Sequence, residues 1–235
     1  MCITPDVLFQ ALRVDASLNC AQNVGTVTQP ADKLSVPPAD AAALLRAAGL
    51  GAFFRPSQVE AAGITREQLR TLFQRGTVEH VGRGLYRMGD AEPTEHYSLA
   101  MACARVPNSI VCLLSALRVH GIGTQAPAEV WLAIPHKART PRLPELRLRI
   151  VRFSGPAWTF GVQGTTFEGV PARITSPART VADCFRFERL VGREAVIEAL
   201  QDGLRQRKFT IAELSRVEEF LPSRRLSAAL DMRSI

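Results

Sequence analysis

The first regular pattern of hydrophobic and polar positions begins near residue 39 and predicts two short helices. Residues 41–48 are a run of strong helix formers that a glycine ends. Residues 56–62 predict a second helix, because proline is favoured in a first turn and Gly63 follows. The preceding residues, 1–38, show no sustained period and end among prolines, which predicts a poorly ordered leader.

A third helix and a hairpin are predicted directly afterwards. The sequence TREQ is a capping-box pattern, so we expect a helix over 65–75. Leu69, Leu72 and Phe73 follow at spacings of three and four residues, which predicts one inward-facing stripe. After a glycine, VEHVGRGLYRM alternates around a turn and predicts a β-hairpin over 77–88.

Helix, glycine-containing turn, helix and hairpin in this order are the plan of a winged helix-turn-helix domain, predicted over 39–90. In that plan the second helix of the turn enters the major groove of DNA. Arg66, Arg70 and Gln74 lie at successive i+4 steps and share one helix face. Arginine suits this place because its planar fork pairs with guanine O6 and N7. The alternative is an ordinary surface helix beside a hairpin, with solvated arginines.

The pattern changes again after residue 90 and predicts a mixed α+β domain over 91–222, with helices at both ends. The expected helices are 94–105, 114–120, 178–187, 193–205 and 211–220. The expected strands are 130–135 and 146–153, followed by a hairpin over 165–175. Residues 223–235 are interpreted as a tail. The fold class is therefore α+β: a winged helix-turn-helix domain, then a domain with a central antiparallel or mixed sheet and C-terminal helices.

Composition adds a basic balance to this picture. The chain carries 29 Lys and Arg against 22 Asp and Glu, a net charge of +7 that fits a polyanionic partner. Its five cysteines form no CxxC and its four histidines show no ligand spacing, so we expect no metal, no cofactor and a reducing cytoplasm. No stretch approaches the roughly 18 apolar residues of a membrane helix, and we expect no membrane partner.

The positive charge is densest over residues 136–152, where six Lys and Arg accompany one Glu. One interpretation is a second patch that contacts phosphates and steepens the salt dependence of binding. The other is a solvated loop and the outer face of a strand, since 146–150 alternates with period two. The candidate patch consists of Lys137, Arg139, Arg142, Arg147 and Arg149.

Motifs of common catalytic centres do not occur in the sequence. It contains no GxxxxGK[ST] loop, no DxD pair, no ExK tripeptide and no GxSxG elbow. Arg179 and Asp183, four residues apart, predict a structural salt bridge on one helix face. A catalytic role for Asp183 is the alternative, but no second carboxylate stands at a matching spacing. We therefore predict no catalytic residue and no enzymatic activity.

The segment GITREQLRTLFQRGTVEHVGRGLYR, residues 63–87, resembles the N-terminal winged-helix domain of AbiEi-type antitoxins from bacterial type IV toxin–antitoxin systems. In both, a small residue and an arginine open the helix, and an arginine-rich turn ends in GLYR. SALRVHGIG (115–123), VWLAIP (130–135) and ITSPARTVADCF (174–185) follow in the family's order and spacing. Residues 1–38 have no counterpart in the family.

The resemblance implies a DNA-binding antitoxin and transcriptional autorepressor, which reads promoter repeats with helix 65–75 and wing 77–88. Its partners would be the double-stranded DNA of its own promoter and a nucleotidyltransferase-like toxin that the second domain neutralises. The resemblance places DNA contacts at Thr65, Arg66, Gln68, Arg70, Arg83 and Arg87, and the predicted set also includes Thr71 and Gln74. Two alternatives stay open: a winged-helix regulator without a toxin, and an enzyme with an unrecognised site in the second domain.

Overall fold

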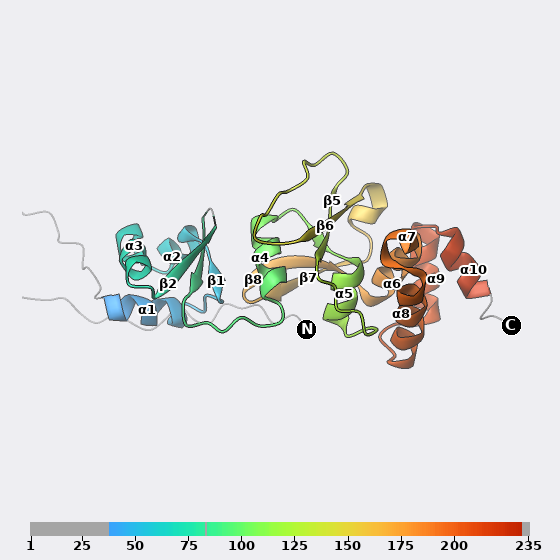
Figure 1. Ribbon diagram of the computed structural model, residues 1–235, viewed down its shortest axis with the longest axis horizontal. Coiled ribbons are helices and arrows are strands. Elements are labelled where there is room, and N and C mark those ends of the chain that lie inside the picture. The colour runs from blue at the N-terminus through green and yellow to red at the C-terminus, as the bar shows by residue number, and fades with distance from the viewer. Residues whose placement is uncertain (1–37, 83, 232–235) are drawn as a thin grey trace, which may run out of the picture. The chain divides into compact units, whose positions relative to one another are not determined.

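Three helices and a three-stranded sheet form the N-terminal module, residues 38–89, in the computed structural model (Figure 1). The helices are α1 (Pro38–Ala47), α2 (Pro56–Ala61) and α3 (Arg66–Gln74). The strands β1 (Phe53–Phe54), β2 (Val78–Gly82) and β3 (Leu85–Met88) pair antiparallel in the order β1-β3-β2. This arrangement confirms the winged helix predicted from the sequence.

The structure describes residues 38–82 and 84–231. The predictions for the leader and for Arg83 therefore lie outside the described residues. All described residues belong to one compact unit, residues 36–235. The division of this unit into domains at residue 90 stays a prediction.

The core of the N-terminal module gathers hydrophobic side chains from its helices and its sheet. Its buried residues are Leu45, Phe54, Val59, Ile64, Leu69, Leu72, Val78 and Met88. Two members of the predicted inward stripe of α3, Leu69 and Leu72, lie in this core. The third was predicted wrongly: Phe73 is 48% exposed, because the core contacts only one flank of the stripe.

A mixed five-stranded sheet forms the centre of the C-terminal module, residues 97–231. Its strands are β4 (Ile110–Val111), β5 (Val130–Pro135), β6 (Leu148–Phe153), β7 (Val162–Phe167) and β8 (Val170–Thr175). They lie in the order β6-β5-β4-β8-β7, with β5–β6 and β4–β8 parallel and the other pairs antiparallel. Parallel neighbours need a crossover connection, and residues 136–147 supply it between β5 and β6. The predicted α+β class is confirmed.

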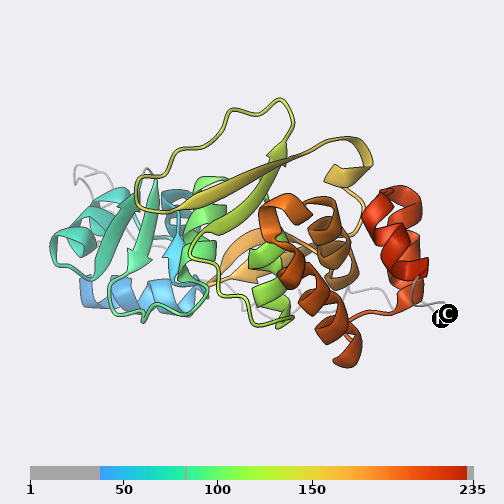
Figure 2. The same ribbon diagram turned by 45° about the vertical axis from the view of Figure 1, so that its right-hand side comes forward.

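Seven α-helices and a short 3-10 helix complete the described part of this module. They are α4 (Tyr97–Arg105), α5 (Leu113–His120), η1 (Gly155–Trp158), α6 (Pro177–Arg186), α7 (Glu188–Val191), α8 (Arg193–Arg205), α9 (Ile211–Phe220) and α10 (Arg224–Asp231). Figure 2 shows α6, α8, α9 and α10 grouped beside the sheet. The prediction of a tail after residue 222 was wrong, because Leu226 is fully buried in the core and holds α10 against it.

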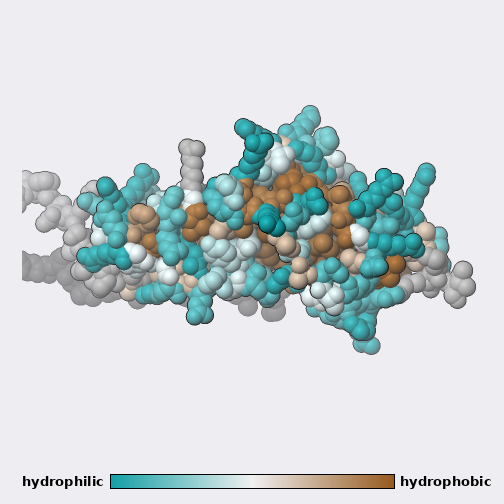
Figure 3. All heavy atoms as spheres, in the orientation of Figure 1, coloured by the Kyte–Doolittle hydropathy of each residue, from teal (hydrophilic) through white to brown (hydrophobic). Residues whose placement is uncertain are grey.

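Hydrophobic packing joins the two modules. Phe53 of β1 and Leu85 of β3 are buried in a cluster with Leu99, Phe167 and Val170 of the C-terminal module. Beside this cluster the backbone of Gly51 meets the β7–β8 turn, where an added Cβ would lie 2.5 Å from the Cα of Gly169. On the surface, hydrophobic atoms gather over β5 and β6 (Figure 3).

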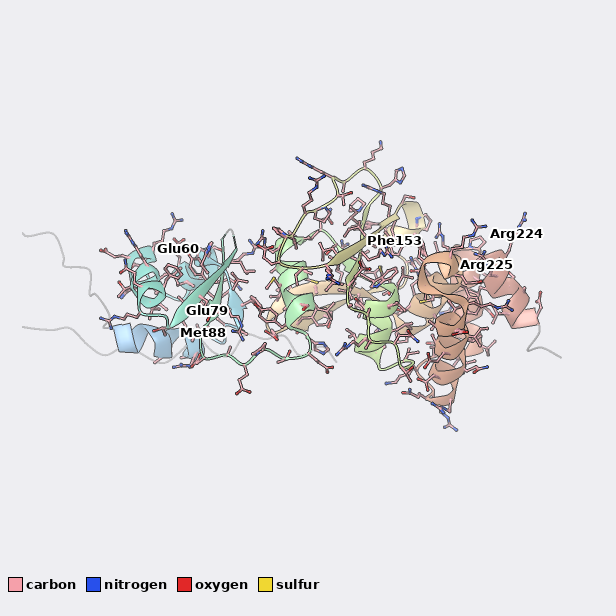
Figure 4. The ribbon with its side chains drawn as sticks, in the orientation of Figure 1. Glu60, Glu79, Met88, Phe153, Arg224 and Arg225 are labelled. Carbon is pink, nitrogen blue, oxygen red and sulfur yellow. The ribbon has the colours of Figure 1, made fainter. Side chains whose placement is uncertain are left out.

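The predicted salt bridge of α6 lies in the C-terminal core. Arg179 is fully buried and its Nε donates to Asp183 Oδ2 at 2.8 Å. The guanidinium also donates to the carbonyl oxygens of Phe160 and Ala157, and lies 5.1 Å from the ring centre of Phe153, labelled in Figure 4. Burial raises the pKa of Asp183 to about 6, and Arg179 offsets part of this rise. The salt bridge predicted on α6 is thus present, and it is buried.

Candidate nucleic-acid interface

The turn between α2 and α3 sets the direction of the helix that is expected to read DNA. Gly63 has a φ of +82°, a left-handed conformation that favours glycine. Ile64 follows with 1% of its surface exposed, and its backbone N–H donates to the Val59 carbonyl at 3.1 Å. The turn is thus anchored to the core directly before α3 begins.

The N-terminus of α3 is closed by the predicted capping box. Thr65 Oγ1 accepts from the Gln68 backbone N–H at 3.2 Å, and Gln68 Oε1 accepts from the Thr65 backbone N–H at 2.8 Å. These bonds satisfy two donors that the helix itself leaves unpaired. Thr65 and Gln68 therefore have a structural role, and their contact with DNA stays a prediction.

The remaining predicted residues of α3 lie along its solvent side. Arg70 and Gln74 are exposed, and Arg70 forms no ion pair with any described residue. Arg66 is also exposed, with 81% of its side chain accessible, but its Nε pairs with the carboxylate of Glu60 on α2. Glu60 is labelled in Figure 4. Thr71 is half-buried and donates its hydroxyl to the Glu67 carbonyl at 3.0 Å. One face of α3 therefore presents two guanidinium groups and an amide to solvent.

Arg87 needs a correction, because the structure buries the residue that was predicted to contact DNA. Only 6% of its surface is exposed. Its Nη2 donates to the Ala91 carbonyl, its Nη1 lies 3.9 Å from Glu79, and its guanidinium lies 5.3 Å from the ring centre of Tyr97. Arg87 thus holds the chain segment that follows β3, and we remove it from the candidate interface.

A row of aromatic rings beside the exposed face of α3 was not predicted. Phe73 meets His80 of β2 edge-on, with 6.5 Å between ring centroids, and His80 meets Tyr86 of β3 at 5.2 Å. Tyr86 in turn stacks on buried Phe54 at 6.3 Å. One signal in the sequence points to the exposure of Phe73, since it stands seven residues after Arg66 and so lies on almost the same line of the helix.

The candidate basic patch lies on the β5–β6 crossover and on β6, and all five of its residues are exposed. Arg149 pairs with Glu129 at 3.3 Å and lies 5.5 Å from the ring centre of Trp131. Arg152 of β6 holds the crossover in place, because its Nη1 donates to the carbonyls of His136 and Ala138 at 2.6 and 2.8 Å. Four cations therefore remain without an ion pair among the described residues: Lys137, Arg139, Arg142 and Arg147.

Metal sites and membrane-spanning helices find no support in the described part of the chain. No group of three or more His, Cys, Asp or Glu side chains there is placed to hold a metal ion. None of the helices between residues 38 and 231 combines the length and apolar character needed to cross a bilayer. The exposed face of α3, with Arg66, Arg70 and Gln74, is the candidate site.

The geometry of α2, α3 and the β2–β3 hairpin defines the N-terminal module as a winged helix-turn-helix, a class that places its second helix in the DNA major groove. Residues 42–89 match the family described as "Transcriptional regulator, AbiEi antitoxin". The resemblance to AbiEi-type antitoxins is thus confirmed over these residues. Because the family is described as a transcriptional regulator, the match supports a DNA-binding regulator.

The fold as a whole has a relative among solved structures. The crystal structure of the RV2827C protein from Mycobacterium tuberculosis is similar with a TM-score of 0.52, covering 83% of this chain and 77% of that chain. The two sequences are 17% identical, so the similarity concerns the fold alone. No curated protein matches the chain.

Proposed function

We propose that this protein is an antitoxin and the DNA-binding autorepressor of a type IV toxin–antitoxin operon. The observation that carries the proposal is the exposed face of α3, with Arg66, Arg70 and Gln74, in a winged helix that matches the AbiEi regulator family. The major groove admits an α-helix, and guanidinium and amide groups are the side chains that pair with guanine and adenine there.

The structure suggests different roles for the two arginines. Arg70 is free of ion pairs among the described residues and is ready to pair with a guanine edge. Arg66 must first leave Glu60, so part of its binding energy is spent on breaking that pair. In the proposal Gln74 reads adenine, and Arg83 at the turn of the wing contacts phosphate.

Promoter repeats require two copies of the recognition helix, one for each half-site. We propose that the C-terminal module supports this pairing and neutralises a nucleotidyltransferase-like toxin. The basic patch of the β5–β6 crossover would then face either the DNA backbone or the toxin. Both are consistent with its exposed cations, and their different salt dependence separates them.

The direct test is fluorescence anisotropy of the full chain on the DNA upstream of its own gene and on scrambled DNA of equal composition, over a salt series. We expect tighter binding to the upstream DNA. Arg66→Ala and Arg70→Ala should each lower that affinity about 5- to 150-fold, the range for removing one bidentate pairing with a base. Arg189→Ala and Arg216→Ala, each of which removes one exposed arginine, on α7 and α9 respectively, are the controls of equal charge.

Equal decreases on upstream and scrambled DNA would contradict the base-reading role of α3. The antitoxin part is tested by co-expression with the nucleotidyltransferase-like toxin that the proposal expects beside this gene. The wild type should restore growth, and so should the α3 variants that no longer bind DNA. Upstream DNA binding without any rescue would favour a regulator that has no toxin.

A further inference from the structure

The recognition helix carries one large hydrophobic side chain that the core does not use. Leu69 and Leu72 of α3 are 4% and 1% exposed, whereas Phe73 is 48% exposed. Because about half of the Phe73 side chain stays in water, the fold gains only part of the hydrophobic stabilisation that full burial of the ring would give. The same surface is therefore available to a partner that covers α3.

Neighbouring rings hold Phe73 at a definite place on the helix. It lies seven residues after Arg66, which is nearly two turns and about 10.5 Å along the same line of α3. His80 contacts the ring edge-on from β2, and Tyr86 supports His80 from β3. The ring thus stands on the side of α3 that faces the hairpin, next to the line of Arg66 and Arg70.

The charges around the ring indicate what covers it. Arg66 and Arg70 are exposed on α3 and Arg75 is exposed directly after it, whereas Glu67 is the one exposed acidic residue of the helix. A polyanion complements this surface, whereas the hydrophobic face of another protein would leave the guanidinium groups without partners. On the major-groove edge of DNA the apolar group is the thymine C5-methyl, with which phenylalanine side chains make apolar contact.

We propose that Phe73 contacts thymine methyl groups in the major groove and makes the protein select thymine at that place in its operator. The inference rests on the proposed function, since it assumes that α3 enters the groove. It adds a specificity-determining residue that reads an apolar group, beside the arginines that read guanine.

The test compares the upstream DNA with the same DNA in which every thymine is replaced by uracil, a change that removes only methyl groups. Binding of the full chain is measured by fluorescence anisotropy for the wild type, Phe73→Ala and Phe220→Ala. Phe220 is the matched control because it is 54% exposed but lies on α9. Thermal unfolding of each variant verifies folding.

We expect Phe73→Ala to bind thymine DNA about three- to tenfold more weakly, as follows from covering half a phenyl ring. The wild type and Phe220→Ala should bind uracil DNA about two- to fourfold more weakly, the effect of a buried methyl, whereas Phe73→Ala should bind both DNAs alike. This absence of discrimination in Phe73→Ala is the decisive result.

Three results would overturn the inference. If Phe73→Ala weakens both DNAs equally but still discriminates between them, the ring packs on deoxyribose rather than thymine. If the variant binds as the wild type does but changes the molecular mass in light scattering, the ring belongs to a contact between copies. A wild type that does not prefer its upstream DNA to scrambled DNA refutes the proposed function itself, and the inference with it.

Discussion

The pairing of Arg66 with Glu60 yields a prediction that runs against the usual effect of mutating an interface: Glu60→Gln should tighten DNA binding. In the free protein the Glu60 carboxylate holds Arg66, although Arg66 remains 81% accessible. To reach a base, the guanidinium must give up this partner. Glutamine removes the negative charge while retaining the shape of the side chain, so the arginine is released in advance.

The magnitude follows from the exposure of the pair. Exposed ion pairs contribute about 0.2–1 kcal/mol, and this is the energy that DNA binding no longer has to supply. It corresponds to about 1.4- to 5-fold tighter binding. Repulsion between Glu60 and nearby phosphates is also removed, so the gain should be largest at low salt. The free energy of unfolding should fall by no more than about 1 kcal/mol.

A double-mutant cycle isolates this effect from the general change in charge. Anisotropy on upstream DNA is measured for the wild type, Glu60→Gln, Arg66→Ala and the double variant. The gain from Glu60→Gln should shrink in the Arg66→Ala background, where no arginine is left to release. Glu219→Gln on α9 controls for the removal of one exposed carboxylate. Unchanged or weaker binding by Glu60→Gln would refute the reasoning, as would equal gains in both backgrounds.

Three further predictions concern the junction, the buried ion pair and the basic patch. Gly51→Ala should lower the free energy of unfolding by about 1–3 kcal/mol in denaturant melts, because its Cβ would meet backbone atoms of the β7–β8 turn; Gly164→Ala, which meets nothing within 4 Å, should not. The pKa of Asp183 is about 6 in the folded protein against 3.8 for the free side chain, so ionisation favours the unfolded chain between these values. The free energy of unfolding of the wild type, relative to that of Asp183→Asn, should therefore decrease as pH rises from about 4 to about 6. An increase over this range would contradict the raised pKa. Lys137→Ala with Arg139→Ala should flatten the salt slope by about 0.9 for each phosphate that the variant no longer neutralises, and an unchanged slope would assign the patch to another partner.

The sequence predicts well those elements of the fold that depend on short-range patterns. The capping box of Thr65 and Gln68 locates the start of α3, and alternating residues around GRG locate the hairpin. These signals succeed because the hydrogen bonds and the side-chain alternation that create them lie within a few residues. The winged helix could therefore be assembled from neighbouring elements in their order along the chain.

The wrong predictions concern residues whose burial and contacts depend on distant parts of the chain. Phe73 stands at the margin of the apolar stripe, and the sequence does not reveal which flank of α3 the core covers. Arg87 was assigned to DNA from the family resemblance, which does not reveal its partners beyond the hairpin, the Ala91 carbonyl and the Tyr97 ring. Helix α10 is short, and the burial of Leu226 depends on a core built from several other elements.

The shared burial of Phe53 and Leu85 has a consequence for how such proteins diversify. Both side chains come from the winged helix, yet each is covered in a cluster with residues of the five-stranded sheet. A gene fusion that joined this winged helix to another protein would expose these two large apolar side chains to solvent. Such recombination is therefore expected to succeed only with recipients that bring a matching hydrophobic surface, so the winged helix and its sheet should be inherited together.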